Sequence, residues 1–221
     1  MSYQHLIGLL GSALVALGFV GGGWWLLAVW LGSDFLILAV AHAKGAHGVF
    51  GKRADGTLPL WSWVVYLPLL TYTSLVWHLA RALSREKHCD AVTSDLKVGR
   101  RPLPHEVDGT FANYVDLTAE FQEPVRIRRS VSYTAFPILD GSAPPSQELM
   151  NAVNRLRPGH TFIHCAQGHG RTGLFAAAVL LRSGIARNVD DAMQMLQTVR
   201  PSIRLNRAQL QCIEEFARNV A

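Results

Sequence analysis

Residues 164–173 read HCAQGHGRTG and place the thiol of Cys165 six positions before the guanidinium of Arg171. Residues 161–164 before this stretch are apolar or β-branched and predict a short buried strand, whereas residues 174–181 are rich in alanine and leucine and predict a helix. At a turn from strand to helix, backbone N–H groups lack internal partners and converge on an anion together with the positive end of the helix dipole. The same field favours a thiolate at Cys165, and Arg171 offers a planar fork for two phosphate oxygens. The stretch therefore predicts a phosphate-binding loop that contains a nucleophile.

This stretch resembles the His-Cys-x5-Arg-Ser/Thr signature of cysteine-dependent phosphatases, most closely that of the dual-specificity branch. Seven fixed positions would coincide by chance on the order of once in a billion starting points. The resemblance implies an α/β domain whose central sheet is flanked by helices, and an enzyme that hydrolyses phosphoric monoesters through a phosphocysteine intermediate without a cofactor or metal ion. The alternative is a buried structural cysteine beside an ordinary glycine-rich turn, and Arg171 argues against it.

The resemblance also assigns roles within the stretch. Cys165 is expected to attack phosphorus, and the hydroxyl of Thr172 to donate to the sulfur when the thiolate leaves again. His164 is expected to be a buried imidazole that is satisfied by backbone groups and orients the loop, whereas His169 faces either substrate or solvent. The residues expected to bind the phosphate group are Ala166, Gln167, Gly168, His169, Gly170 and Arg171.

Protonation of the leaving oxygen requires a general acid from another part of the chain. Asp140 lies among turn-forming residues after a strand-like stretch, at about the distance before the cysteine where the resembled family carries its acid loop. A turn aspartate that caps the next helix is the alternative. Asp116 and Glu120 are the competing carboxylates, and their expected role is to hold loops together.

Residues 200–210 resemble the Arg-Pro segment and the helix that close such domains. Family members often carry an Asn or Gln here that supports the loop or the hydrolytic water, which makes Asn206 and Gln209 candidates. The alternative is a capping box, in which Asn206 begins the helix and Gln209 is its partner three residues on.

Residues 1–43 contain neither lysine nor arginine and one acidic residue, Asp34, although 17% of the whole chain is charged. Two apolar runs, 6–20 and 24–41, are separated by three glycines and together predict a transmembrane helical hairpin. One long tilted helix remains an alternative. A cleaved signal peptide is disfavoured, because no basic residue precedes the first run and a second run follows at once. We expect Asp34 to pack against another helix or to contact water, since an ionisable group is costly here.

Residues 44–88 form a basic loop around a third uncharged run, from Leu58 to Ala80. Pro68 interrupts this run, which is rich in tryptophan and tyrosine, as interfacial segments are. Positive residues flank the run on both sides, and positive charge marks the cytoplasmic side of a membrane. We therefore expect the run to lie on the membrane or dip into it, with a third span as the alternative.

Residues 89–221 have the composition of an α/β domain, large enough to bury one core, and the resemblance to phosphatases covers this part alone. The predicted strands are 96–98, 114–117, 125–127, 131–133 and 161–164. The predicted helices are 146–155, 173–183, 188–197 and 206–218.

Charge and cysteine content limit the possible partners and the location. Three cysteines offer no disulfide framework, and a reactive thiolate needs a reducing environment, so the catalytic domain of this membrane protein is expected to face the cytoplasm. The net charge of +5 suits an anionic bilayer surface. Nucleic acid is the weaker explanation, because the basic residues are not interleaved with aromatic residues, and no metal-ligand spacing is present.

Two substrate classes follow from a phosphatase domain tied to a membrane. A lipid phosphate headgroup is favoured, because the bilayer presents it at high effective concentration. The loop positions 166, 167 and 169 contain no lysine, unlike relatives that act on highly charged inositol lipids, so a singly phosphorylated headgroup is expected. The alternative is a membrane-anchored tyrosine or dual-specificity phosphatase acting on phosphoproteins. A phosphate-binding adaptor without activity is disfavoured, because Cys165, Arg171 and Asp140 are all present.

Overall fold

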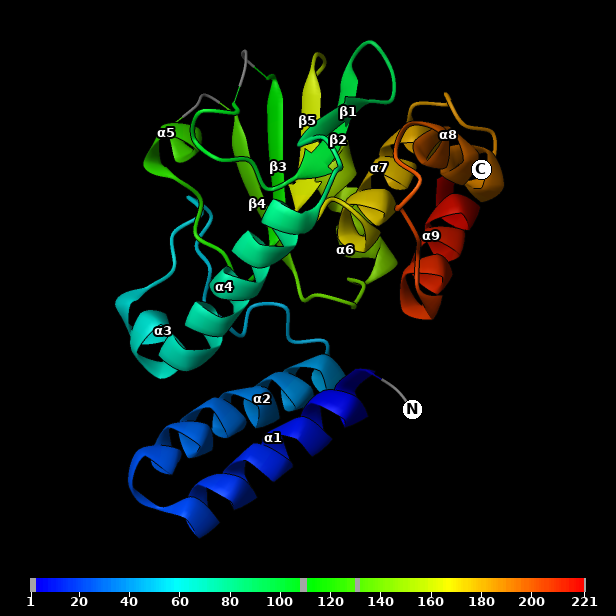
Figure 1. Ribbon diagram of the computed structural model, residues 1–221. Helices are drawn as coiled ribbons and strands as arrows, with labels where there is room; N and C mark the ends of the chain where they lie inside the picture. Colours follow the sequence, from blue (N-terminus) through cyan, green and yellow to red (C-terminus); the bar gives the residue numbers. More distant parts are fainter. Residues whose placement is uncertain (1–2, 108–110, 130–131, 221) are drawn as a thin grey trace.

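The computed structural model describes residues 3–107, 111–129 and 132–220 and places a hairpin of apolar helices at one end of an α/β unit (Figure 1). The five strands lie in the order β1-β2-β5-β3-β4, with β1 antiparallel to β2 and the other neighbours parallel. The strands are β1 (Cys89–Ala91), β2 (Leu96–Arg100), β3 (Asn113–Thr118), β4 (Tyr133–Ile138) and β5 (Thr161–Cys165). The predicted α/β class with a central sheet flanked by helices is confirmed.

The central position of β5 brings the phosphate-binding loop to the middle of one sheet edge. Arg100 at the end of β2 pairs with Cys165, and Asp116 of β3 pairs with His164. In parallel sheets, ligands bind beyond the carboxyl ends of the strands. The loop after Cys165 therefore starts where neighbouring strand ends can contribute side chains.

Four helices of this unit begin and end close to their predicted bounds, namely α6 (Ser146–Asn154), α7 (Gly170–Arg182), α8 (Val189–Val199) and α9 (Arg207–Val220). A short helix that was not predicted, α5 (Val125–Arg128), precedes them. The strand predicted over 125–127 is wrong, because Pro124 starts a helical turn there that buries Ile127 and leaves Val125 exposed. The strand predicted over 131–133 begins instead at Tyr133, and Val131 lies outside the described residues.

The first two helices, α1 (Tyr3–Gly21) and α2 (Leu26–Lys44), pack side by side and are joined by a short 3-10 turn, Gly23–Trp25 (Figure 1). Both are long and apolar enough to cross a membrane. A Cβ atom added to Gly11 would lie 2.8 Å from the carbonyl oxygen of Gly32, and one added to Gly32 would lie 2.7 Å from that of Gly11. Such close backbone contact through small residues is typical of packed apolar helices.

The third apolar run divides into α3 (Leu60–Val65) and α4 (Leu67–Leu83), and Pro68 stands in the first turn of α4. Helix α4 lies between the hairpin and the sheet and buries Trp77 toward the α/β unit (Figure 1). Its N-terminus also accounts for Asp34, whose buried carboxylate faces the backbone N–H of Leu69 in the first turn. Asp34 is thus a helix-packing residue.

Exposed apolar side chains gather in the first four helices. Among the described residues, every exposed large hydrophobic side chain except Val125, Ile185 and Leu210 precedes residue 84. A soluble surface rarely presents a contiguous apolar area of this extent. In the described part of the α/β unit, the exposed large hydrophobic side chains are limited to Val125, Ile185 and Leu210.

Lys52 ties the segment after the hairpin to the sheet through a buried ion pair. Its Nζ lies 2.5 Å from Asp116 Oδ2 and 2.6 Å from the carbonyl oxygen of Thr118. The Lys52 and Asp116 side chains are 1% and 0% exposed. The sequence places Lys52 in the basic loop of residues 44–88, and the structure buries its side chain as the counter-ion of a core carboxylate.

Replacing Lys52 by alanine leaves Asp116 buried without its cation. Loss of one partner of a buried ion pair costs about 3–5 kcal/mol, so we expect a clearly lower unfolding midpoint for K52A in detergent micelles. The control is Lys44→Ala at the exposed end of α2, expected to change stability by less than about 0.5 kcal/mol. Equal midpoints for the two variants would contradict the structural role of the pair.

Candidate active site

Cys165 is the last residue of β5, and its side chain is almost fully buried at the base of the loop. The N–H of Gly168 donates to Cys165 Sγ at 3.3 Å, which favours negative charge on the sulfur. Gly168 has φ of +76°, and a Cβ atom there would lie 2.4 Å from the carbonyl carbon of Gly99 on β2. Glycine is therefore required both by the backbone conformation and by the adjacent strand.

Arg171 lies in the first turn of α7 and is held by carboxylates from two other strand ends. Its Nη1 and Nη2 donate to the two oxygens of Glu120 at 2.9 and 2.8 Å, in a bidentate pair. Nη1 also donates to the carbonyl of Ile138, and Nη2 lies 3.2 Å from Asp140 Oδ1. Burial opposes the charge, but Glu120 and Asp140 outweigh it and raise the pKa of Arg171 well above its usual value. The guanidinium is thus fixed in orientation and permanently charged.

Asp140 lies in the turn that follows β4, and its side chain is 70% exposed. It lines one cavity of about 290 Å³ together with Cys165 and Arg171. Ala166, Gln167, His169 and Gly170 line the same cavity, whereas Gly168, Thr172 and His164 do not. The structure therefore brings the predicted nucleophile, arginine and acid to a single cavity.

Thr172 and His164 lie behind the loop and not in the cavity. The hydroxyl of Thr172 is buried and makes no hydrogen bond to any described residue, so the expected bond to the Cys165 sulfur is not formed in this structure. His164 is fully buried against the rings of Tyr114 and Phe162. Burial lowers the pKa of His164 to about 4, despite the nearby Asp116 carboxylate. The imidazole is therefore neutral at physiological pH.

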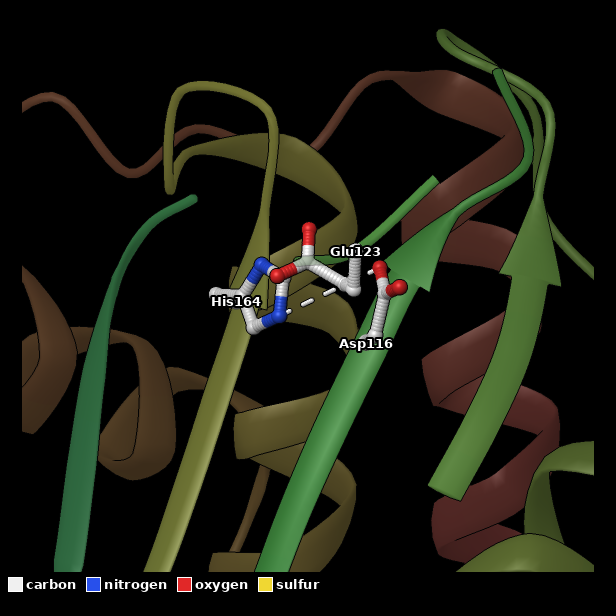
Figure 2. A group of neighbouring side chains, drawn as sticks. All are labelled: Asp116, Glu123 and His164. Atoms are coloured by element: carbon white, nitrogen blue, oxygen red, sulfur yellow. Dashed lines mark ion pairs between the residues drawn. The ribbon is translucent and has the colours of Figure 1, made fainter. Parts of the chain in front are cut away.

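Asp116, Glu123 and His164 converge in the core, where their ligand-type atoms lie within 4.8 Å of one another (Figure 2). Three such groups could bind a metal ion, but cations of the protein already balance both carboxylates. Lys52 outweighs the effect of burial and holds the pKa of Asp116 below its usual range. Arg101 Nε contacts Glu123 Oε1 at 2.6 Å, although burial and the Asp116 charge raise the pKa of Glu123 to about 7. Each carboxylate of this group is thus paired with a cation of the protein in the core.

Arg200 anchors the outside of the loop. It donates from Nε to the carbonyl of Gly168 at 2.9 Å and from Nη2 to that of Gln167 at 3.0 Å. Its charge is balanced by Glu86 and Asp90, each at 2.8 Å. Arg200 was not among the residues predicted for the site. The resemblance of residues 200–210 to the Arg-Pro segment of the family was the feature of the sequence that could have indicated it.

Two further contacts hold the phosphate-binding loop and were not predicted from the sequence. The indole N–H of Trp77 on α4 donates to the carbonyl of Ala166 at 3.0 Å, so a helix of the apolar region contacts the loop directly. His169, whose direction the sequence left open, lies with Nε2 2.9 Å from Glu86 Oε2. No local pattern signals the Trp77 contact, because 89 residues separate the two partners.

Asn206 and Gln209 form the capping box that the sequence offered as an alternative. Asn206 N–H donates to Gln209 Oε1 at 3.2 Å, and Gln209 N–H donates to Asn206 Oδ1 at 3.0 Å. Their side-chain amides also donate to the carbonyls of Gly141 and Ser142, directly after Asp140. Neither residue lines the cavity, but Gln209 also lies against the loop itself, because a Cβ atom added to Gly170 would lie 2.9 Å from Gln209 Oε1.

Replacing Gly168 by alanine tests the loop geometry. The added Cβ would clash with the β2 backbone at 2.4 Å, so the loop must move and we expect kcat/KM to fall at least about 100-fold. The control is Gly184→Ala, where φ is +70° but no atom lies within 4 Å of the new Cβ. G184A should lose about 1 kcal/mol of stability and keep its activity. Similar phosphatase activity in both variants would contradict the assignment of this loop.

Comparison with known proteins places this site in a family. Residues 115–215 match the family described as Swiss Army Knife protein, DSP-PTPase phosphatase domain (PTP-SAK). No curated protein sequence matches the chain.

Solved structures give the same fold. PTPMT1 in complex with PI(5)P is 15% identical, with a TM-score of 0.52, over 61% of this chain and 97% of that one. Tk-PTP in its active form is 22% identical, with a TM-score of 0.52, over 59% and 97%. Human DUSP28 is 16% identical, with a TM-score of 0.53, over 61% and 96%. The structures show the fold, and the family match over residues 115–215 identifies a phosphatase (DSP-PTPase) domain, a phosphoric monoester hydrolase, in this part of the chain.

Proposed function

We propose that this protein is a membrane-anchored phosphatase that removes a single phosphate group from a lipid headgroup. One observation carries the proposal: the catalytic cavity adjoins an apolar groove formed by α1, α2 and α4. Four residues line both spaces, namely Thr73, Val76, Glu120 and Asp140. A headgroup phosphate at Cys165 would therefore place the apolar part of the same molecule at the groove.

The groove has the chemistry of a site for an acyl chain. It measures about 360 Å³, and two of the three helices that form it, α1 and α2, are long and apolar enough to cross a membrane. The apolar residues that line it are Leu6, Ile7, Leu10, Phe35, Leu38, Phe50, Leu69, Val76 and Leu139. An apolar chain in this groove would be removed from water, which favours binding by about 0.8 kcal/mol per buried methylene group.

The distribution of apolar surface supports membrane anchoring. The exposed hydrophobic side chains of α1 and α2 would be covered by lipid, and those of α4, such as Tyr72, Leu75 and Leu79, suit the interface. Exposed basic residues flank the third apolar run, including Lys44 and Arg85. Together with three cysteines that form no disulfide in the described part of the chain, this charge placement favours a catalytic domain on the cytoplasmic side. In this arrangement the run lies on the membrane and does not span it.

The reaction proceeds in two steps. The Cys165 thiolate attacks phosphorus, the S–P bond forms, the P–O bond to the headgroup breaks, and Asp140 gives its proton to the departing oxygen. Arg171 and the loop N–H groups hold the equatorial oxygens, and Arg171 Nε, which has no partner among the described residues, is free to join them. Water then attacks the phosphocysteine while Asp140 takes its proton, and inorganic phosphate leaves. The unpaired Thr172 hydroxyl donates to the sulfur as the S–P bond breaks.

The charge of the cavity favours a substrate with one phosphate group. Arg171 is the guanidinium in the lining, whereas Glu120 and Asp140 contribute two carboxylates. The loop carries no lysine at positions 166, 167 or 169, and His169 is already engaged by Glu86. A second phosphate would meet net negative charge here. PTPMT1, a structure of similar fold, was solved in complex with PI(5)P, which agrees with a lipid substrate.

The proposal is tested by measuring phosphate release by the purified full-length protein from lipid phosphomonoesters in mixed micelles, beside phosphotyrosine and phosphoserine peptides. We expect higher kcat/KM for a lipid, and we expect Cys165→Ser to abolish turnover while binding remains. Preference for peptides would replace the lipid assignment by the protein phosphatase alternative. Full activity of C165S would contradict the cysteine mechanism itself.

A second prediction concerns the groove. Leu10→Trp places an indole among its walls and should lower kcat/KM at least about tenfold for a long-chain lipid phosphate, with little change for a small water-soluble aryl phosphate. The matched control is Leu9→Trp, which adds the same side chain at an exposed position of α1 outside the groove. Equal loss on both substrates, or equal loss in both variants, would show that the groove does not bind the substrate.

A further inference from the structure

The loop that carries Asp140 is held through its backbone and not by burial of its acidic side chain. That side chain is 70% exposed, so the chain on either side must fix its position. On one side, Asn206 Nδ2 donates to the carbonyl of Gly141 at 2.8 Å, and Gln209 Nε2 donates to that of Ser142 at 3.2 Å. The capping box of α9 therefore holds the loop after Asp140.

On the other side, two histidines at the end of the membrane hairpin contact the same loop. His42, in the last turn of α2, has Nε2 2.9 Å from the backbone carbonyl of Asp140 itself. The backbone N–H of Leu139 donates to Nδ1 of His47 at 3.3 Å. The ring of Tyr3 on α1 packs edge-on against His42, with ring centroids 5.2 Å apart. The hairpin thus contacts the proposed acid at its own peptide group.

His42 is the hydrogen-bond donor in its contact with the Asp140 loop. Nε2 lies 2.9 Å from the carbonyl of Asp140, and Nδ1 lies 2.8 Å from that of Leu38. A carbonyl oxygen only accepts, so the hydrogen bond to the Asp140 peptide requires the proton to be on Nε2. Tyr3 of α1 and His47 of the following segment are neighbouring titratable groups.

We propose that His42 is a positioning residue for Asp140, through which the membrane hairpin fixes the acid of the phosphatase reaction. The proposal rests on the proposed function, because it takes Asp140 as the proton donor. His42 touches no reacting atom. Its donor N–H sets the direction of the Asp140 peptide and hence the distance from the carboxyl group to the departing oxygen. A general acid displaced from hydrogen-bond reach loses its contribution to the rate, which is typically 100-fold to 10,000-fold.

The test compares substrates that need the acid to different degrees. Methyl phosphate, an alkyl phosphate without a chain to reach the groove that His42 also lines, needs a proton on its leaving oxygen, whereas 4-nitrophenyl phosphate releases a stable anion. We expect His42→Ala to lower kcat about tenfold for the alkyl phosphate and less than about twofold for 4-nitrophenyl phosphate, with KM unchanged. His42→Gln should restore most of the loss, because its carboxamide N–H can reach the same carbonyl. The control is Lys44→Ala, exposed in the same last turn of α2.

Two outcomes would overturn the proposal: equal loss on both substrates, or further loss when His42→Ala is added to Asp140→Asn. In the latter background a residue that acts through Asp140 has nothing left to position, so no further loss is expected. The unfolding midpoints of His42→Gln and His42→Ala show whether a loss of rate reflects misfolding or misplacement of the acid. Asp140→Asn alone tests the underlying assignment. If it lowers both substrates equally, Asp140 is not the acid, whereas a leaving-group effect in D140N without one in H42A refutes only the role of His42.

Discussion

A loop that turns its backbone N–H groups toward an anion must turn its carbonyl groups outward, and every buried carbonyl needs a donor. The rest of this structure depends on that constraint. The carbonyl of Ala166 receives the indole N–H of Trp77, and those of Gln167 and Gly168 receive the guanidinium of Arg200. The backbone N–H of Arg101, directly after β2, also donates to the carbonyl of Ala166. A helix of the apolar region, the end of β2 and the segment before α9 thus bind the outer side of the loop and leave its N–H groups available for phosphate.

This arrangement joins the apolar N-terminal region to the α/β unit at three points. Trp77 of α4 contacts the loop, Lys52 enters the core as the counter-ion of Asp116, and His42 contacts the Asp140 loop. Each contact comes from a segment before residue 84. The apolar helices and the segment between them therefore supply donors and a buried charge to the α/β unit. In the proposed function they also form the walls of the substrate groove.

The parts of the site that could be predicted are those encoded locally. A strand, a glycine-rich turn and a helix in succession define the position of Cys165 and Arg171, and the spacing of three between Asn206 and Gln209 encodes the capping box. The contacts of Trp77 and Lys52 could not be predicted, because their partners lie 89 and 64 residues away. A lysine in a basic stretch also resembles a surface residue until a buried carboxylate is found beside it.

Composition alone also did not decide the type of element in two places where tertiary packing buries one face of the element. The run from Leu58 to Ala80 has the apolar content of a membrane span, but it divides at Tyr66, and α4 buries Trp77 against the loop. Val125 and Ile127 alternate with polar residues as in a strand, yet Pro124 begins a helical turn there. In both places, partners distant in the sequence decide which face is covered.

The central claim is that one continuous site binds the phosphate at Cys165 and an apolar chain between α1, α2 and α4. The most direct measurement is kcat/KM for a series of single-chain phosphate monoesters that differ only in chain length, all assayed below their micellar concentrations. A continuous site predicts a steady rise with each added methylene until the groove is filled, by up to about fourfold per group. A value independent of chain length would contradict the account and confine recognition to the phosphate cavity.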